Sequence, residues 1–232
     1  PTVSRLSLQL SLKTFSSRFL QGKVQFESTT IICRGGVMAS AEFVHLHGHS
    51  EYSLLDGGCR VKEMAENAAE LGMTAMAVTD HGNLFGAIEH YKACKSVGIK
   101  PIIGCEAYVA IESRHARKSV RGLSHGSNHL VLLAKNEMGY RNLTKLVSLG
   151  YQEGFYYFPR IDKELLREYG EGLICLSACV AGEISHLIRG EGLDEAEKAV
   201  CEYMEIFGDD YYLEIQRHGI DIEAKVNEGL LL

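Results

Sequence analysis

The sequence lacks any long hydrophobic run, and no apolar stretch approaches the about 18 residues that a transmembrane helix requires. It also lacks an excess of basic residues, because 24 Lys and Arg stand against 30 Asp and Glu and give a formal net charge of −6. This balance excludes a generally basic protein that coats nucleic acid, although it leaves room for a local basic patch. An acidic site filled with divalent cations also fits this charge.

No secretory signal precedes the seven cysteines, which are scattered and odd in number. We therefore expect a reducing cytoplasm with mostly buried thiols rather than a disulfide framework. The composition, with 46% apolar and 23% charged residues among 232, is that of a globular chain long enough for one large domain.

Acidic residues are nearly absent from the first part of the chain. Residues 1–37 contain ten Ser or Thr, five Lys or Arg and a single acid, Glu27, and the first methionine is Met38. We therefore predict a leader at residues 1–40, disordered or outside the natural fold, and a domain at residues 41–232. A Ser-rich, Arg-bearing, acid-poor leader could also be an organelle transit peptide.

From Phe43 onward, short apolar runs alternate with amphipathic stretches of helical period, which predicts β/α units with a parallel sheet. The predicted strands are 43–47, 74–79, 100–104, 128–134, 172–177 and 211–215. The predicted helices are 61–72, 84–97, 137–149, 162–169, 180–189, 194–206 and 221–231. Gly72 and Gly98 stand where helix C-caps fall, and Asp194 stands where an N-cap falls. Six strands fit part of a seven- or eight-stranded barrel.

Potential metal ligands follow these strands, at the end where parallel β/α folds collect their reactive groups. In the extended segment His47-Gly-His49, alternate residues point to the same side and can hold one cation between two imidazoles. A single histidine at a strand end is usually structural, so the coincidence of many candidates carries the prediction. The candidates are His47, His49, Asp56, His81, Glu106, His129 and Cys179.

This donor set indicates a multinuclear centre. Imidazole, carboxylate and thiolate together suit Zn²⁺, Mn²⁺ or Fe²⁺, and do not suit Mg²⁺ alone. Seven candidates exceed what a single tetrahedral ion can use. We therefore expect two to three divalent metals, with a bridging carboxylate such as Glu106 and ions roughly 3.5 to 4 Å apart, a geometry that clamps the oxygens of a phosphoester.

Five segments carry motifs of one protein family: HLHGHSEYSLLDG (45–57), TDHGNLFGAIEHYK (79–92), GIKPIIGCEAYVA (98–110), HLVLLAKNEMGYRNL (129–143) and GLICLSACVAGEI (172–184). They resemble the PHP (polymerase and histidinol phosphatase) domain at the N-terminus of the bacterial DNA polymerase III alpha subunit. The resemblance covers about residues 42–232. The elements TDHG and HxH are common to PHP proteins, whereas GNLFGAIEHYKACKSVGIKPIIGCEAYVA is of the polymerase type.

The resemblance implies an α/β fold, a distorted (β/α)7-type PHP barrel truncated before its last strand or strands. The family's ligands fall on the seven candidates, all matching in type, while a further Asp-x-His of the family pattern is not contained in this chain. The resemblance also implies a metal-dependent 3′→5′ exonuclease or phosphoesterase acting on DNA 3′ ends through metal-activated water, with no covalent nucleophile. The parent protein would be a nucleotidyltransferase of DNA replication, whose polymerase active site lies outside this fragment.

The implied partners are a DNA primer-template, the rest of the polymerase chain, a sliding clamp, a clamp loader and a proofreading subunit, in the bacterial cytoplasm and without a membrane. Two alternatives stay open. One is a phosphomonoesterase of the histidinol-phosphatase type that shares the metals. The other is a non-catalytic module, stabilised by metals, within a replicative or repair polymerase.

Further residues have weaker assignments. Asp80 is expected either to orient a neighbouring imidazole or to cap the next helix. His45 and His218 are expected near the site, His45 as a core or supporting residue rather than a ligand. Nucleic-acid contacts are possible for Arg114, Arg117, Lys118 and Arg121, in a loop without acidic residues that could equally be a solvated loop, and for Arg160 beside the aromatic run 155–158, which could stack on a base.

Overall fold

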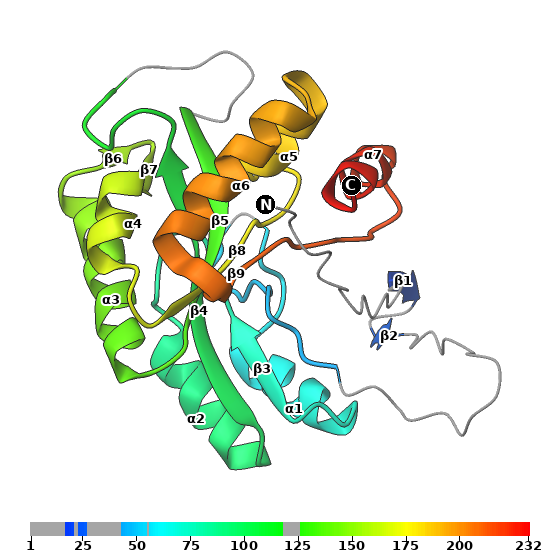
Figure 1. Ribbon diagram of the computed structural model, residues 1–232. Helices are drawn as coiled ribbons and strands as arrows, with labels where there is room; N and C mark the ends of the chain where they lie inside the picture. The colour runs from blue at the N-terminus through cyan, green and yellow to red at the C-terminus, as the bar shows by residue number, and fades with distance from the viewer. Residues whose placement is uncertain (1–16, 21–22, 27–42, 55, 118–125) are drawn as a thin grey trace.

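The computed structural model of the chain describes residues 17–20, 23–26, 43–54, 56–117 and 126–232 (Figure 1). The predicted leader at 1–40 lies outside the described residues, apart from an antiparallel pair formed by β1 (Ser17–Leu20) and β2 (Lys23–Phe26). Across the described parts of the chain, every helix is too short or too polar to cross a membrane.

A mixed sheet of seven strands organises the domain. The strands are β3 (Ala75–Val78), β4 (Lys100–Ala110), β5 (Ser127–Ala134), β6 (Phe155–Tyr156), β7 (Phe158–Ile161), β8 (Leu173–Leu176) and β9 (Tyr211–Tyr212). Their order is β6-β7-β4-β5-β8-β9, and β3 also pairs with β4. The α/β class is therefore confirmed.

The prediction of a parallel sheet holds for only part of the sheet, which is mixed. The pairs β3–β4, β4–β7 and β8–β9 are parallel, whereas β5 is antiparallel to both β4 and β8, and β6 is antiparallel to β7. The parallel pair β3–β4 is joined through α2, whereas β4 and β5 pair antiparallel, an arrangement that needs no crossover helix. The short strands β6 and β7 form a hairpin that the sequence patterns missed.

Seven helices occupy the predicted places, each within three residues of its predicted bounds. They are α1 (Val61–Glu70), α2 (Ala87–Val97), α3 (Glu137–Gln152), α4 (Lys163–Tyr169), α5 (Glu183–Gly190), α6 (Leu193–Phe207) and α7 (Asp221–Leu230). Gly98 is the left-handed C-cap of α2, as predicted. Gly72, also left-handed, follows the C-cap Leu71, and Asp194 lies in the first turn of α6, whose N-cap is Gly192.

The two faces of β4 and β5 carry different side chains, because successive residues of a strand point to opposite faces. One face belongs to the main core, with Cys105, Ala107, Val109, Leu130 and Leu132 packed in one cluster with Leu143 and Leu146 of α3. The opposite face carries Glu106, paired in register with Val131, and His129, paired with Tyr108. The ligand candidates of these strands therefore lie on the face opposite the main core.

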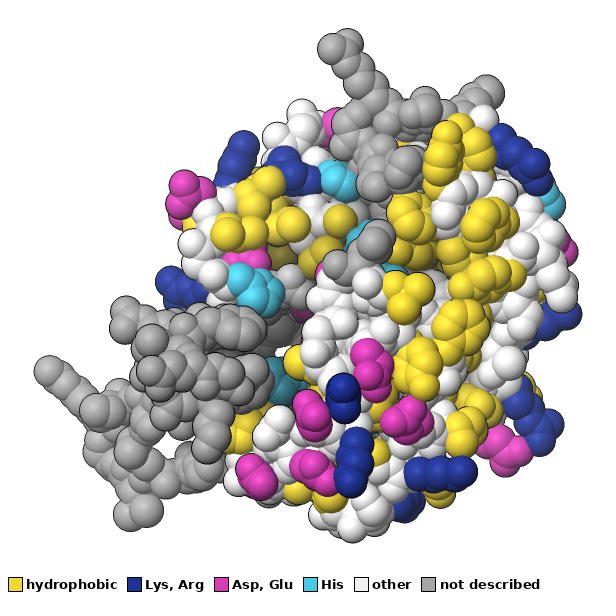
Figure 2. All heavy atoms as spheres, turned by 180° about the vertical axis from the view of Figure 1, so that it is seen from behind, with side chains coloured by type: hydrophobic (Ala, Val, Ile, Leu, Met, Phe, Trp, Pro, Cys, Tyr) yellow, Lys and Arg dark blue, Asp and Glu magenta, His cyan; other side chains and the backbone are white. Residues whose placement is uncertain are grey.

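Exposed apolar side chains gather along one side of the molecule, where Figure 2 shows a band of them. Exposed aromatics include Phe85, Tyr151 and Phe155, whose neighbouring ring centroids lie 6.5 and 6.2 Å apart. Phe158, by contrast, stacks internally on Tyr108 at 4.5 Å. The aromatic run 155–158 is thus divided between the surface and local packing, and base stacking by Phe155 stays a prediction.

Candidate metal centre

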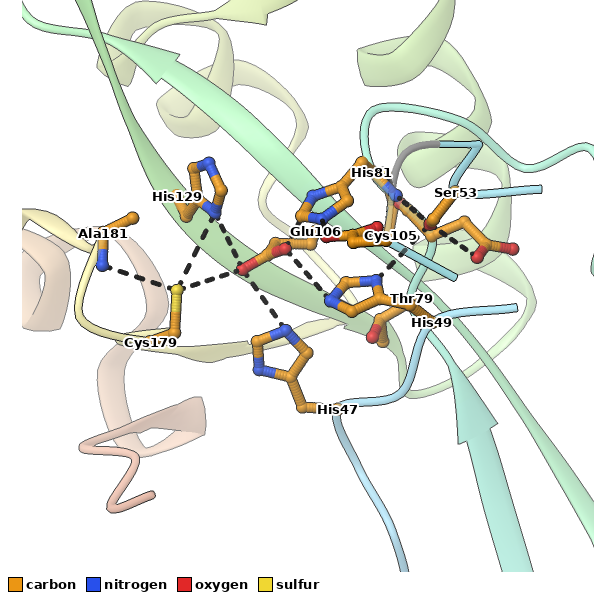
Figure 3. A network of polar contacts seen from close by, with 12 residues as sticks. His47, His49, Ser53, Thr79, His81, Cys105, Glu106, His129, Cys179 and Ala181 are labelled. Atoms are coloured by element: carbon orange, nitrogen blue, oxygen red, sulfur yellow. Dashed lines mark hydrogen bonds and ion pairs between the residues drawn. The ribbon is translucent and has the colours of Figure 1, made fainter. Parts of the chain in front are cut away.

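A buried carboxylate, Glu106, lies at the middle of the site (Figure 3). Its side chain is 1% exposed, and four imidazoles surround it. The distances are 3.2 Å from His47 Nε2 and 3.0 Å from His129 Nδ1 to Oε1, and 3.3 Å from His49 Nε2 and 2.7 Å from His81 Nδ1 to Oε2. Each carboxylate oxygen is therefore shared by two rings.

The two remaining candidates stand at the edges of this group. Asp56 Oδ2 lies 2.7 Å from His81 Nε2, and the Asp56 side chain is 53% exposed. Cys179 Sγ lies 3.7 Å from Glu106 Oε1 and 3.8 Å from His129 Nδ1. The structure thus brings all seven sequence-predicted ligands into one continuous group with a buried and an open end.

The two histidines of the first motif come from an extended segment beside β3. Ala77 N donates to His45 O and Thr79 N donates to Gly48 O, both at 2.8 Å. The segment makes no regular strand, so the strand predicted at 43–47 is wrong, but its extended backbone still directs His47 and His49 toward Glu106. His47 and His49 therefore point to the same side, as the alternation predicted, although their segment is not part of a regular β-strand.

Asp80 organises the turn that leads to Asp56. Its buried carboxylate accepts from the Ser50 backbone N and hydroxyl, both at 2.7 Å, and from the Ser53 hydroxyl at 2.8 Å. The Ser53 hydroxyl in turn accepts from the backbone N of His81 at 3.1 Å. The expected contact of Asp80 with an imidazole, and its expected helix-capping role, are both replaced by this support of two serines.

Two backbone features fix neighbouring ligands. Gly82, directly after His81, has φ +61°, and a β-carbon there would lie 2.8 Å from Pro159 Cγ. Ala178, directly before Cys179, has φ 62°, a left-handed conformation that is uncommon for a residue with a side chain. A strained position such as Ala178 persists only where the surrounding structure over-determines it. The turns at Gly82 and Ala178 set the backbone direction at the neighbouring candidates His81 and Cys179.

Attraction between the carboxylates and the imidazoles dominates the electrostatics of the group. Burial opposes ionisation of Glu106, but the close imidazoles of His129, His47 and His81 hold the pKa of its carboxyl well below its usual range. Burial also opposes protonation of His47, yet Glu106 and Glu214 raise the pKa of His47 to about 10. The carboxylates likewise raise the pKa of His81 against the effect of burial. The group accumulates positive charge around one buried anion.

For Cys179 and His49, by contrast, the effect of burial on the pKa outweighs that of the neighbouring charges. Burial, followed by the charge of Glu106, raises the pKa of the Cys179 thiol to about 12. Burial lowers the pKa of His49. The thiol therefore needs a nearby cation before it can ionise near neutral pH, as expected for a thiolate ligand.

The residues present fit divalent metals. Two sets of three ligand atoms lie within 4.8 Å of one another, His47-His49-Glu106 and His81-Glu106-His129, and Glu106 belongs to both. His81 Nδ1 and Glu106 Oε2 lie 2.7 Å apart, yet neither buried atom has a hydrogen-bond partner among the described residues. Close donor atoms without hydrogen-bond geometry are expected where both can coordinate a cation. Imidazole and carboxylate donors suit transition metals.

Sequence reasoning missed Glu214 and Gln216. Glu214 Oε1 lies 2.8 Å from His47 Nδ1, and Gln216 Nε2 donates to the same oxygen at 2.7 Å. Both residues follow β9, so the rule that directs attention to strand ends could have found them. The residue predicted from this segment, His218, lies further along it.

His218 and His45 lie outside the ligand group. His218 Nδ1 contacts Glu223 Oε1 at 2.5 Å and its backbone N donates to Glu223 Oε2 at 2.6 Å, so the pair supports the start of α7. His45 meets Phe43 edge-on, with ring centroids 4.8 Å apart, and burial lowers its pKa. The imidazoles in contact with Glu106 are instead those of His47, His49, His81 and His129.

The basic candidates for DNA contact separate into different environments. The guanidinium of Arg160 is buried and donates to the backbone carbonyls of residues 114, 116 and 154, so its assignment to nucleic acid is wrong. Arg114 is paired with carboxylates of residues 153, 162 and 164. Arg117 is exposed. Lys118 and Arg121 lie outside the described residues.

Comparison with known proteins gives matches over most of the chain. The PHP domain family matches residues 45–218. The DNA polymerase III subunit alpha of Borreliella burgdorferi is 52% identical over 191 residues, covering 82% of this chain and 17% of that protein. The same subunit of Thermus aquaticus is 50% identical over 191 residues, covering 82% of this chain and 16% of that protein.

Among solved structures, a Bifidobacterium adolescentis protein proposed to be a metal-dependent phosphoesterase matches 82% of this chain and 64% of its own, with 17% identity and a TM-score of 0.33. The chain thus spans about a sixth of the length of the curated relatives it matches.

Proposed function

This chain belongs to the PHP domain family, and from that premise we propose that it is the N-terminal metal-dependent phosphoesterase domain of a bacterial DNA polymerase III alpha subunit. Its substrate is the terminal phosphodiester of a DNA 3′ end, which it hydrolyses in the 3′→5′ direction. The observation that carries this proposal is Glu106, a buried carboxylate shared by two sets of ligand atoms.

The site would hold two or three divalent cations, with zinc, manganese or iron preferred over magnesium because of its imidazole and thiol donors. Glu106 would bridge, and the other ligands would be His47, His49, Asp56, His81, His129 and Cys179. Divalent cations bound there would activate water and stabilise the charge that develops on the phosphate and the leaving oxygen.

The protein's own residues shape how a substrate can approach. Glu106 is 1% exposed and closes the inner end of the site, whereas Asp56 is 53% exposed and marks the open end. Asp80, through Ser53, holds the turn between His49 and Asp56 in place. A frayed, mispaired 3′ end would enter the open end more readily than a paired one, so selectivity requires no reading of the base.

The test is degradation of a 3′-mispaired DNA primer by the full-length protein in Mn²⁺ or Zn²⁺. We expect activity that disappears with a chelator and in the double variant His47→Ala, His49→Ala. The exposed His115→Ala variant serves as the matched control and should retain activity. Absence of degradation by a wild-type protein that still binds metal tightly would refute the nuclease.

A second candidate function is a metal-stabilised structural module of the polymerase. It is favoured by one observation: the ligands come from separate segments, including the extended stretch at 47–49, the end of β3, β4, β5 and the turn after β8. Metals there would tie these segments together. In that case a chelator would lower the melting temperature, and no nuclease activity would be lost.

Within the parent subunit, we expect the domain to act on a primer-template in the bacterial cytoplasm. The remaining polymerase chain, a sliding clamp, a clamp loader and a proofreading subunit are the partners proposed from the family. A histidinol-phosphatase-type phosphomonoesterase would share the metals but would release phosphate from small monoesters. Parallel assays of a small phosphomonoester and the DNA primer distinguish these substrates.

A further inference from the structure

Glu214 lies behind His47, on the opposite side of the ring from Glu106. His47 Nδ1 is 2.8 Å from Glu214 Oε1, and His47 Nε2 is 3.2 Å from Glu106 Oε1. The side chains of His47 and Glu214 are only 9% and 13% exposed. The imidazole is therefore held between two carboxylates, with one at each nitrogen.

This arrangement determines which nitrogen can bind a cation. A neutral imidazole carries one N–H and one lone pair, and the hydrogen bond at one nitrogen sets the role of the other. When a cation displaces the hydrogen of Nε2, the remaining hydrogen of His47 stays on Nδ1, because the carboxylate oxygen of Glu214 only accepts. The lone pair is then left on Nε2, which faces Glu106 and the other ligands.

Glu214 is itself held by contacts outside the ligand group. Its backbone N donates to the hydroxyl of the buried Ser177 at 2.8 Å, at the end of β8. Gln216 Nε2 donates to Glu214 Oε1 at 2.7 Å, and Asn227 of α7 donates to the backbone carbonyl of Gln216 at 2.8 Å. A continuous series of hydrogen bonds thus connects α7 to the ring of His47.

We propose that Glu214 is a positioning residue of the metal centre, which holds the hydrogen of His47 at Nδ1 and presents Nε2 to a divalent cation. Gln216 supports it by fixing the orientation of the Glu214 carboxylate. This inference rests on the proposed function, since it requires that His47 binds a metal. Carboxylates behind ligand histidines orient the ring and strengthen its basicity, and their loss lowers metal affinity about 10- to 100-fold.

The direct experiment measures Zn²⁺ affinity of the 232-residue chain by competition with a chromophoric chelator. Glu214→Gln keeps the size of the side chain but removes its charge, and we expect about 10- to 100-fold weaker zinc binding. The matched control is Glu202→Gln, which removes a part-buried carboxylate paired with Lys163 and Arg167 on the helical side of the domain. That control should bind zinc as the wild type does.

A double-mutant cycle separates positioning from direct ligation. If Glu214 acts through His47, Glu214→Gln should have no further effect on zinc affinity in a His47→Ala background. If Glu214 were itself a ligand, its loss would weaken binding equally in both backgrounds, and the positioning role would be overturned. Nitrogen-15 NMR of the zinc-bound chain should also show the remaining hydrogen of His47 on Nδ1 in the wild type and a changed distribution of that hydrogen in the variant.

A second variant keeps the test decisive if Glu214→Gln fails to fold. Gln216→Met removes the donor to Glu214 Oε1, together with the 3.2 Å contact of that donor with His47 Nδ1, while leaving the His47–Glu214 contact. We expect a several-fold loss of zinc affinity. Equal affinity of both folded variants and the wild type would overturn the inference and leave the metal centre standing. A wild-type chain that binds no zinc would instead overturn the proposed metal centre.

Discussion

The metal-free chain should lose stability as pH rises above neutral, because His47 of the site is protonated in the folded state. Glu106 and Glu214 raise the pKa of His47 from 6.5 to about 10, against the effect of burial. A group with a raised folded-state pKa stabilises the fold fully below its unfolded pKa, and this stabilisation is lost as pH rises toward the folded pKa. For His47 this window runs from 6.5 to about 10.

The expected magnitude follows from one proton. Between about pH 7 and about pH 8.5 the folded chain keeps a proton on His47 that the unfolded chain has released, at about 1.4 kcal/mol per pH unit. The free energy of unfolding should therefore fall by about 2 kcal/mol over this range. The raised pKa of His81 acts in the same direction. His49, with a lowered pKa, is neutral in both states there and contributes nothing.

The perturbation is Glu106→Gln, which retains the side-chain volume and removes the anion shared by both histidines. Because Glu214 still contacts His47, we expect the fall to shrink to roughly 1 kcal/mol rather than vanish. Urea unfolding in the presence of a chelator, at a series of pH values, measures both slopes. The chain contains no tryptophan, so far-UV circular dichroism is the suitable signal.

Glu202→Gln is the control, since Glu202 pairs with Lys163 and Arg167 and contacts no histidine in its described ion pairs. It should lower stability slightly and leave the slope unchanged. A wild-type stability that is flat or rises between about pH 7 and about pH 8.5 would refute the reasoning. A Glu106→Gln slope equal to that of the wild type would refute the role of Glu106.

Three further predictions follow from the structure. Zinc binding at about pH 7 should release about one proton, because a cation displaces the proton of His47, and affinity should therefore decrease as pH falls. Calorimetry in buffers of different ionisation enthalpy measures the release, and buffer-independent heats would contradict it. Gly82→Ala should lower the free energy of unfolding by more than the control Gly72→Ala, because Gly72 has a similar left-handed φ but open space where a β-carbon would lie. In urea unfolding we expect a loss of about 1 kcal/mol for the control and of several kcal/mol for Gly82→Ala. Equal losses would contradict the packing argument. Arg160→Met should lower the free energy of unfolding by about 2 to 4 kcal/mol, because it leaves buried carbonyls without donors. DNA affinity per folded molecule should be unchanged in a gel-shift assay. A stable variant with weakened DNA binding would instead support the predicted contact of Arg160 with nucleic acid.

Local patterns in the sequence predicted most elements of this fold. Helical periodicity placed all seven helices close to their observed bounds, because the apolar residues on the buried face of an amphipathic helix recur every three to four positions. Strand ends marked by histidines and acids gave all seven ligand candidates, and motif resemblance supplied the family. These signals are local, and each can be recognised in the sequence without information about long-range contacts.

Other features depended on contacts between distant segments. The direction of β5, the hairpin of β6 and β7, and the irregular backbone at 43–47 follow from how strands pair, which periodicity does not encode. Arg160 looked available to DNA because an arginine beside aromatics resembles a binding site. Only its burial against the carbonyls of the 114–116 segment shows otherwise.

The sequence by itself identified the candidate metal ligands, because imidazole, carboxylate and thiol donors are properties of single side chains at recognisable spacings. The tertiary structure decided their relations: that four imidazoles surround Glu106, that Asp80 supports serines, and that Glu214 lies behind His47, 167 residues away in the chain. Hydrogen bonds of this kind act over about 3 Å and carry no signature at such sequence separation, so the fold alone reveals them.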